Sequence, residues 1–562
     1  MIKSMLLVAS VAASSTVYAA VPSTLDSVFA PVKVATGPSD AYIGLSRMPD
    51  GELRHYNYGE QADAGSFYLS STDGGLTWRK VKAARDMPQA DIASPLSGEY
   101  IRLVNMGADG VYCIRTKGGP SGDRTVTKVS DIASIMIKPP VFAQGGKRIV
   151  VAAHGGVDPK GCYTYVSTDD GLTWTRSNTV ETPPHTGGGF HQGIRWNHGA
   201  VEPTVVELTD GRLWMLMRTP HDRHYEAFST DGGLTWSEPQ PSRFYGTITM
   251  PTIGRLADGR LLFFWCNTTP LPELPTANGV WDDVFTNRDV THVAISDDDG
   301  ATWTGFRELM LDPMRNESDY ALRGRGIDRG MHQAQFIEVE PGKIVAAIGQ
   351  HPLHRAIVAF DVDWLYEPER SDDFTDGLDN WTTFNYIKGI RGHCSYNRIN
   401  GADLVAHPDD ESRNALSLRY QAADSLVSDI RGAVWNFPAA RRGNFSTSLQ
   451  IPAGADGHTL VLNDRWFNPS DTVARHEGIY ILPLSRRKLG IKDDKWHTLT
   501  IDWDLDSRSG ATVRVDGRKR LTLPAANPSA DGISYVHFLA EPTQTDASPR
   551  PILIERVSAT RR

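Results

Sequence analysis

The sequence predicts an all-β protein made of many short strands. Its 562 residues include 51 Gly, 34 Pro and 14 Trp, so turn formers and aromatic anchors are frequent, while stretches with helical periodicity are few. An octapeptide of the form Ser-x-Asp-x-Gly-x-Thr-Trp also occurs four times. A turn sequence repeated in this way indicates a series of similar sheet units.

The octapeptide can itself form a hairpin end. The Asp-Gly or Asp-Asp-Gly step favours a tight turn, the Ser and Asp side chains can bond to turn amides, and Trp anchors the next strand. The copies begin at Ser71, Ser167, Ser229 and Ser296. The first interval (167 − 71 = 96 residues) has room for two units of about 40 to 50 residues, so we expect one unit without its octapeptide.

A second pattern counts the units. An apolar strand, a Gly-containing turn with a basic residue and another apolar strand recur around Gly51, Gly146, Gly211, Gly259 and Gly342, and a weaker copy lies near Gly98. Six such units predict a six-bladed β-propeller. We place this propeller, as the catalytic domain, at residues 21–368.

The pattern changes after Ser371. Segments around Trp381, from Trp496 to Trp503 and from Val513 to Gly517 alternate with a period of two between turn signals. They resemble a concanavalin-A/laminin-G-type jelly roll, so we expect a β-sandwich over residues 369–562. Packing against the propeller and glycan binding are both open as its role.

Residues 1–20 have the pattern of a secretory signal peptide. Lys3 precedes an apolar run from Met5 to Ala13, and Val17-Tyr18-Ala19 forms a small-residue cleavage pattern. We therefore expect export to the periplasm, the cell surface or the medium. No later stretch approaches the roughly 18 apolar residues of a membrane span.

The net charge, the cysteines and the histidines bear on possible partners, disulfide bonds and metal sites. The net charge of −9 is dispersed along the chain, which gives no indication of nucleic-acid binding. The four cysteines, Cys113, Cys162, Cys266 and Cys394, have no CxxC spacing, and buried thiols are favoured slightly over disulfides. No HxH or HxxxH pair lies on a clear strand or helix, so no metal or other cofactor is expected.

The octapeptide resembles the Asp-box, or BNR repeat, of the sialidase (neuraminidase) superfamily. The resemblance implies a six-bladed propeller in which each Asp-box closes an outer hairpin away from the active site, so the motif indicates fold rather than chemistry. It also implies an exo-glycosidase that acts on terminal acidic sugars of extracellular glycans, with α-linked sialic acid as the main expectation.

Residues at equal distances from the turn glycines are expected to surround the central channel. Nine residues before the glycine lie Tyr42, Glu202, Met250 and Gln333, the last with His332 beside it, and seven residues after it lie Tyr58, Arg218 and Ala153, the last with His154 beside it. We expect Tyr58, His154 and Gln333 to contact substrate.

The segment from Glu202 to Arg218 has the closest local resemblance to sialidases. In that family a Glu at this offset partners the nucleophile, and an Arg about sixteen residues later (here 218 − 202 = 16) binds the substrate carboxylate. Alternatively, Glu202 and Arg218 form an ion pair with a purely structural role. Asp63, eight residues before Ser71, lies on the loop that supplies the family's general acid/base.

Three departures from the family pattern are visible. Ala41 to Ile43 replace the family's Arg-Ile-Pro, Met331 to Gln333 occupy the place of the nucleophilic Tyr, and Met250 fills the offset of a further Arg. Arg325 and Arg329, in a Gly-rich basic segment, are candidate replacements for carboxylate binding, unless they form a solvated loop. His332 is a candidate acid or base beside Glu202 and Asp63.

Two other functions fit the same residues. A polysaccharide lyase would use His or Tyr to remove the C5 proton of a uronic acid while Arg neutralises the carboxylate. A non-catalytic glycan-binding protein would use the same channel for recognition alone. The lyase product absorbs in the ultraviolet, whereas a hydrolase releases an intact sugar.

Overall fold

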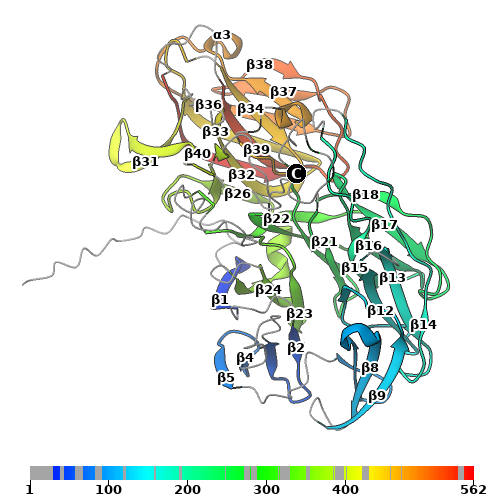
Figure 1. Cartoon of the computed structure of the whole chain (residues 1–562). Coiled ribbons are helices and arrows are strands. Elements are labelled where there is room, and N and C mark those ends of the chain that lie inside the picture. The colour runs from blue at the N-terminus through cyan, green and yellow to red at the C-terminus, as the bar shows by residue number, and fades with distance from the viewer. Residues whose placement is uncertain are drawn as a thin grey trace, which may run out of the picture.

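The computed structural model of the chain describes residues 29–37, 44–56, 67–82, 92–117, 122–156, 160–188, 193–246, 248–270, 277, 279, 288–313, 315–316, 330–349, 355–383, 385–386, 398–399, 401–419, 430–455, 457–469, 471, 473–541 and 550–562. The predicted signal peptide lies outside these residues. In Figure 1 the strands up to β25 fill the lower part of the molecule, and those from β26 onward form the upper part.

Six antiparallel sheets form the blades of a propeller. Blade 1 contains β2 (Leu45–Arg47), β3 (Leu53–Tyr56), β4 (Phe67–Ser71) and β5 (Arg79–Lys82). Blade 2 contains β6 (Ile92–Ala93), β7 (Tyr100–Asn105), β8 (Val111–Lys117) and β9 (Asp123–Ser130), with the 3-10 helix η1 (Gly107–Asp109) between β7 and β8. Blade 3 contains β10 (Met136–Ile137), β11 (Val141–Ala143), β12 (Arg148–Gly155), β13 (Gly161–Ser167) and β14 (Thr175–Arg176).

The remaining blades close the ring. Blade 4 contains β15 (Val201–Glu207), β16 (Leu213–Arg218), β17 (Arg223–Ser229) and β18 (Gln240–Tyr245). Blade 5 contains β19 (Thr252–Arg255), β20 (Leu261–Trp265), β21 (Val290–Ser296) and β22 (Thr304–Leu311). Blade 6 contains β23 (Gln335–Glu340), β24 (Lys343–Ile348), β25 (Ala356–Asp361) and, as its outer strand, β1 (Val32–Thr36) from the N-terminal part of the chain. The predicted six-bladed propeller is confirmed.

The turn glycines counted in the sequence all join the first strands of a blade. Each lies in a connection such as β15–β16 or β23–β24, and each has a left-handed φ, between 72° at Gly98 and 96° at Gly259. A side chain is strained at such angles, which explains why glycine recurs at this one position.

The Asp-boxes lie at the outer edge of the propeller. They connect β4 to β5, β13 to β14, β17 to β18 and β21 to β22. In the first copy, Gly75 N donates to Ser71 Oγ (2.9 Å) and Thr77 N donates to Asp73 Oδ1 (3.0 Å). Blade 6 takes its outer strand from a distant part of the chain, so it has no outer hairpin in which an Asp-box could lie.

The propeller core lies between neighbouring blades. Phe263 of blade 5 packs with Trp214 of blade 4, and Tyr163 of blade 3 packs with Ile101 of blade 2. All four side chains are at most 5% exposed. The blades therefore stack face to face, which leaves their first strands around a central channel.

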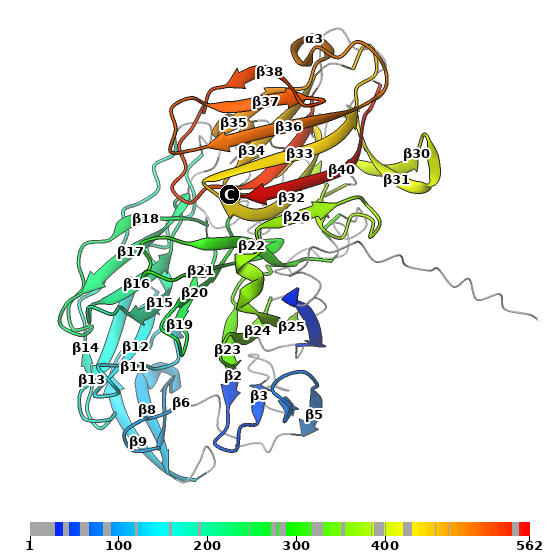
Figure 2. The same cartoon turned by 180° about the vertical axis from the view of Figure 1, so that it is seen from behind.

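The C-terminal part is a sandwich of two large sheets. One sheet has the order β30-β31-β40-β33-β36-β37-β38, with β26 paired to β40, and can be followed in Figure 2. Its strands are β26 (Glu369–Asp372), β30 (Asp403–His407), β31 (Asp410–Leu418), β33 (Arg442–Gln450), β36 (Trp496–Asp504), β37 (Ala511–Val515), β38 (Arg518–Leu523) and β40 (Ile552–Arg561). The other has the order β27-β32-β39-β34-β35, with β27 (Trp381–Thr382), β32 (Arg431–Ala440), β34 (His458–Asn463), β35 (Tyr480–Pro483) and β39 (Ile533–Ala540).

Smaller elements complete this part. β28 (Asn385–Tyr386) pairs with β29 (Arg398–Ile399), and η4 (Ala474–Glu477) and α3 (Arg486–Leu489) are short helices. The 3-10 helix η3 (Val362–Tyr366) follows β25 and packs on the core of blades 5 and 6. The sandwich core contains Trp381, Trp435 and Phe538, all fully buried. The predicted sandwich is confirmed.

The five-stranded sheet carries contacts to the propeller. Tyr535 of β39 donates to Glu308 of β22 (2.7 Å) and contacts the ring of His292 in β21. Thr269 N donates to Trp466 O (2.8 Å), and Trp466 N donates to Asn267 O (3.0 Å). These contacts join propeller and sandwich through buried polar groups.

The structure also shows the state of three cysteines and the lengths of the helices. Cys113, Cys162 and Cys266 are buried free thiols, in line with the expectation for these three, while Cys394 lies outside the described residues. In the part of the chain that the structure describes, we find no helix with the length and apolar character needed to span a membrane.

Candidate active site

Five of the predicted site residues meet where the inner strands of blades 3 and 4 and the start of blade 6 come together. Glu202 and Arg218 lie in β15 and β16, His154 is near the end of β12, and His332 and Gln333 directly precede β23. Each is 7% exposed or less. The offset from the turn glycines therefore located a real cluster, which we call the channel cluster.

Glu202 is the centre of this cluster. Arg218 Nη1 donates to Glu202 Oε2 (2.9 Å), and Gln333 Nε2 donates to Glu202 Oε1 (3.3 Å). Burial opposes ionisation of Glu202, but the charges of Arg218 and Lys138 outweigh it, so the pKa of the carboxyl lies below its usual value. The carboxylate is therefore ionised at neutral pH.

The backbone at the cluster is strained. Glu202 and Gln333 have φ values of 49° and 65°, and the register of β15 with β16 shifts between Val201 and Thr204. Left-handed angles at residues other than glycine cost of order 1–3 kcal/mol and persist only where surrounding contacts impose them. Here one such contact is the hydrogen bond from Glu202 N to His154 Nδ1 (3.0 Å).

His332 is held in a similar way. Met250 N donates to His332 Nδ1 (3.0 Å), which leaves the proton of a neutral ring on Nε2. Arg288 Nη1 lies 3.1 Å from that Nε2. Two N–H donors thus lie side by side, and an anionic oxygen next to the pair would accept from both.

Two other polar side chains border the cluster. Burial lowers the pKa of Lys138 to about 8, although Glu202 acts in the opposite direction. Burial also lowers the pKa of His198 well below its usual value, and neither ring nitrogen has a hydrogen-bond partner among the described residues. His198 is therefore a neutral, buried ring beside two cations, Arg218 and Arg288.

The remaining predicted residues cannot be placed. Asp63, Tyr58, Arg325 and Arg329 lie outside the described residues. Their roles stay predictions.

Two residues of the cluster escaped the sequence analysis. Arg288 follows a long connection between β20, which ends at Trp265, and β21, which begins at Val290, so no fixed offset points to it. Lys138 lies eight residues before Gly146 (146 − 138 = 8), one residue from the offset that identified Glu202, and that near match could have found it. Arg288 provides a further guanidinium at the channel, although Met250 fills the offset of the family's further Arg.

No cluster of three or more His, Cys, Asp or Glu side chains suited to holding a metal ion occurs within the described ranges. The chemistry available from the described residues is that of one carboxylate, several cations and neutral imidazoles. Such a set can bind an anionic group and polarise or protonate what is attached to it.

The propeller and its Asp-boxes define the class of protein. Residues 121–324 match the BNR repeat-like domain family. This match confirms the expected resemblance to BNR-repeat, or Asp-box, propellers over residues 121–324.

Solved structures match the chain at low sequence identity. A Dyadobacter fermentans protein of unknown function is 15% identical, covers 59% of this chain and 97% of its own, and has a TM-score of 0.39. A Trypanosoma rangeli sialidase mutant with trans-sialidase activity is 12% identical, with 95% and 96% covered and a TM-score of 0.33. The T. rangeli sialidase in complex with sialic acid is 13% identical, with 95% and 94% covered and a TM-score of 0.32. At these TM-scores the similarities support no conclusion about this chain, and no curated protein sequence matches it.

Proposed function

We propose that the protein is an exported exo-glycosidase of sialidase type that hydrolyses terminal acidic sugars, chiefly α-linked sialic acid, from extracellular glycans. The observation that carries the proposal is the buried pair of Glu202 and Arg218, 2.9 Å apart, with Arg288 and Lys138 nearby. Among the described residues one carboxylate lies with several cations, which leaves positive charge for the carboxylate of a substrate.

Each residue has a proposed role. Arg218 and Arg288 bind the substrate carboxylate, because guanidinium groups recognise carboxylates through paired N–H donors. Glu202 remains ionised and stabilises positive charge that develops at the sugar ring. Asp63 supplies the proton to the leaving oxygen, as the family resemblance implies.

His332 acts as a hydrogen-bond donor in this scheme. Because its Nδ1 accepts from Met250 N, a neutral ring presents Nε2–H and has no free lone pair for a proton. We therefore assign general-base work to a carboxylate and not to His332 in its present orientation.

A lyase acting beside a uronic acid is the second candidate. The contact between Arg288 Nη1 and His332 Nε2 (3.1 Å) favours it, because proton abstraction next to a carboxylate needs a base beside an arginine. It would require His332 to exchange its tautomer and release Met250 N.

The test is incubation of the mature protein with a fluorogenic α-sialoside, sialylated glycans and uronic-acid glycans, with detection of free sugar and of ultraviolet absorbance. Release of sialic acid that falls at least about 100-fold in Glu202→Gln supports the proposal. Glu340→Gln is the matched control, because Glu340 is 66% exposed in a surface pair with Lys343. No release from any acidic glycoside would exclude the hydrolase, and rising absorbance would establish the lyase.

A further inference from the structure

A second pocket lies between the propeller and the sandwich. It encloses about 700 Å³, within the range of small-ligand sites. Arg223, Tyr225 and Tyr245 of blade 4 line one side, and Arg465, Glu477 and Asn527 of the sandwich line the other. The pocket exists only because the two parts are docked together.

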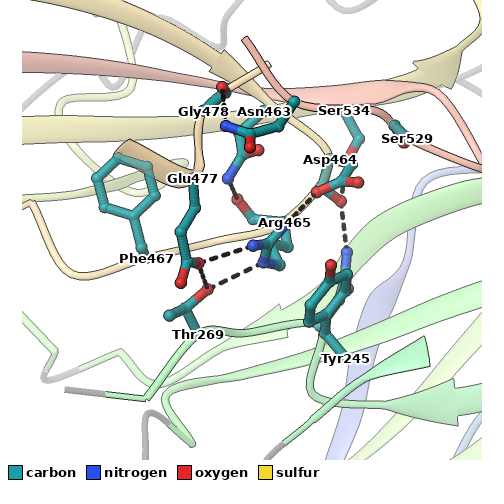
Figure 3. Close-up of polar contacts among 12 residues, drawn as sticks. Tyr245, Thr269, Asn463, Asp464, Arg465, Phe467, Glu477, Gly478, Ser529 and Ser534 are labelled. Carbon is teal, nitrogen blue, oxygen red and sulfur yellow. Dashed lines mark hydrogen bonds and ion pairs between the residues drawn. The ribbon is translucent and has the colours of Figure 1, made fainter. Parts of the chain in front are cut away.

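Arg465 fixes the sandwich side of the pocket (Figure 3). Its guanidinium pairs with Asp464 and Glu477, both at 2.7 Å, and Nε donates to Thr269 Oγ1 of the propeller (3.0 Å). It also lies 3.8 Å from the centre of the Tyr245 ring. Arg465 is thus occupied by carboxylates of its own domain and serves to hold the interface.

Arg223 differs from Arg465 in its partners. It lies 4.4 Å from the centre of the Tyr245 ring that Arg465 also contacts. Arg223 donates to Tyr245 OH (2.8 Å) and to Ser242 O (3.2 Å), which are both neutral acceptors. Among the described residues no carboxylate oxygen lies within 4.0 Å of its guanidinium.

The rest of the wall offers both donors and acceptors. His221 Nε2 donates to Pro183 O (2.8 Å), so a neutral ring keeps Nδ1 as an acceptor. His185 Nδ1 accepts from Arg195 N (3.2 Å), so its ring proton is on Nε2. Asp222, paired with Arg195 at 2.8 Å, has a side chain that is 60% exposed. Sugar hydroxyls, which both donate and accept, match such a set.

We propose that this pocket binds an acidic sugar residue, with its carboxylate on Arg223 and its hydroxyls on His185, His221 and Asp222. The site would be a glycan-binding subsite separate from the channel cluster. It lies next to that cluster along the chain, because β16 ends at Arg218 and the turn that follows leads directly into the pocket. Binding here does not require hydrolysis at Glu202.

The test locates binding by hydrogen–deuterium exchange of the full mature chain. The probes are N-acetylneuraminic acid and glucuronic acid at millimolar concentration, with lactose as the neutral comparison. We expect protection of residues 219–225 and 474–478 with the acidic sugars, and Arg223→Ala to weaken that binding about tenfold or more. Arg212→Ala is the control, because Arg212 also lies over an aromatic ring of blade 4 (5.2 Å from the Phe228 centre) but outside this pocket.

The outcomes separate this inference from the proposed hydrolase. Protection that persists in Glu202→Gln and disappears in Arg223→Ala supports the subsite whether or not the wild type hydrolyses sialosides. Protection confined to residues 198–206 would place the sugar in the channel only and overturn it. Absence of protection at both places at millimolar sugar would also overturn it, as would unchanged protection in Arg223→Ala.

Discussion

The amide of Glu202 donates a hydrogen bond to Nδ1 of His154, 3.0 Å away, so a histidine of blade 3 holds the backbone of the carboxylate in blade 4. Met250 N and His332 Nδ1 repeat the arrangement between blades 5 and 6, also at 3.0 Å. Burial lowers the pKa of His154 to about 4, which keeps the ring neutral and its Nδ1 able to accept.

Replacement of His154 should therefore act through Glu202. His154→Ala leaves the Glu202 amide buried without an acceptor, and we expect a loss of about 1–3 kcal/mol in the free energy of unfolding. Activity should fall as well, since the left-handed backbone of Glu202 loses its restraint. Urea unfolding and the exchange rate of the Glu202 amide measure the two effects.

His154→Asn is the informative comparison, because Asn Oδ1 can take the place of Nδ1. Recovery of most of the stability and of slow exchange would support the positioning role. Equal losses in both variants would show that the ring is needed only for packing.

Arg288→Ala should weaken acidic ligands selectively. The guanidinium is at the channel beside His332, so its loss removes one of two proposed carboxylate ligands. We expect KM for sialosides to rise about tenfold or more, with a smaller change in kcat. Arg260→Ala, in a surface pair with Asp258, should leave KM unchanged. A loss of kcat alone would contradict a binding role.

Acid should unfold the protein through its buried histidines. Burial lowers the pKa of His55, His224 and His292 to about 3, and that of His154 to about 4. In the unfolded chain these rings protonate near pH 6.5, so between that pH and about 4 the unfolded state binds more protons. The contribution of these neutral rings to the free energy of unfolding is fully present above pH 6.5. It falls as the pH drops, by up to about 1.4 kcal/mol per pH unit for each ring.

Urea unfolding between pH 4.5 and 7.5 measures this slope. His224→Asn keeps a donor for Met217 O and removes one titrating ring, so its slope should be smaller by about one proton. An unchanged slope would show that His224 is not neutral in the folded state.

The Asp-box carboxylates should contribute to stability and not to catalysis. Asp231 accepts from Thr235 N (2.9 Å) and Ser229 Oγ (2.8 Å), and these bonds help to hold the β17–β18 turn. We expect Asp231→Ala to lower the free energy of unfolding by about 2 kcal/mol with kcat/KM unchanged. Glu238→Ala is the control, because Glu238 is an exposed neighbour. A large loss of activity in Asp231→Ala without destabilisation would contradict this assignment.

Tyr535→Phe should loosen the junction of propeller and sandwich. The hydroxyl donates to Glu308, whose pKa burial raises, and it contacts His292. Without it both groups are buried with one partner fewer, at a cost of about 1–3 kcal/mol. Scanning calorimetry should show the unfolding transition broaden or split, whereas Tyr480→Phe, in the sandwich core, should shift it without splitting.

The sequence predicted structure well at positions where a single physical requirement selects the residue type. Glycines at left-handed turns gave the number of blades, and the Asp-boxes gave their outer hairpins. Counting from the same glycines located Glu202 and Gln333, because the first strands of blades 4 and 6 have similar lengths, 7 residues in β15 and 6 in β23.

Fixed offsets are uninformative where a connection of variable length lies between a residue and its turn glycine. Arg288 follows a long connection, so its distance from Gly259 carries no information about its place. Blade 6 draws on β1, and a pairing between residues so far apart leaves no local pattern. The Arg465 contacts likewise join segments that are nearly 200 residues apart (465 − 269 = 196).

The use of β1 as the outer strand of blade 6 sets an order of assembly. About 320 residues separate Thr36 from Ala356 (356 − 36 = 320), and these two residues pair in the finished ring. At about 5–20 residues per second, a ribosome makes the partner strand roughly 16–64 s after β1. During that interval β1 has no partner and blade 6 has no outer edge. Ring closure is therefore a late, long-range folding step, and a nascent chain needs protection from aggregation until it occurs.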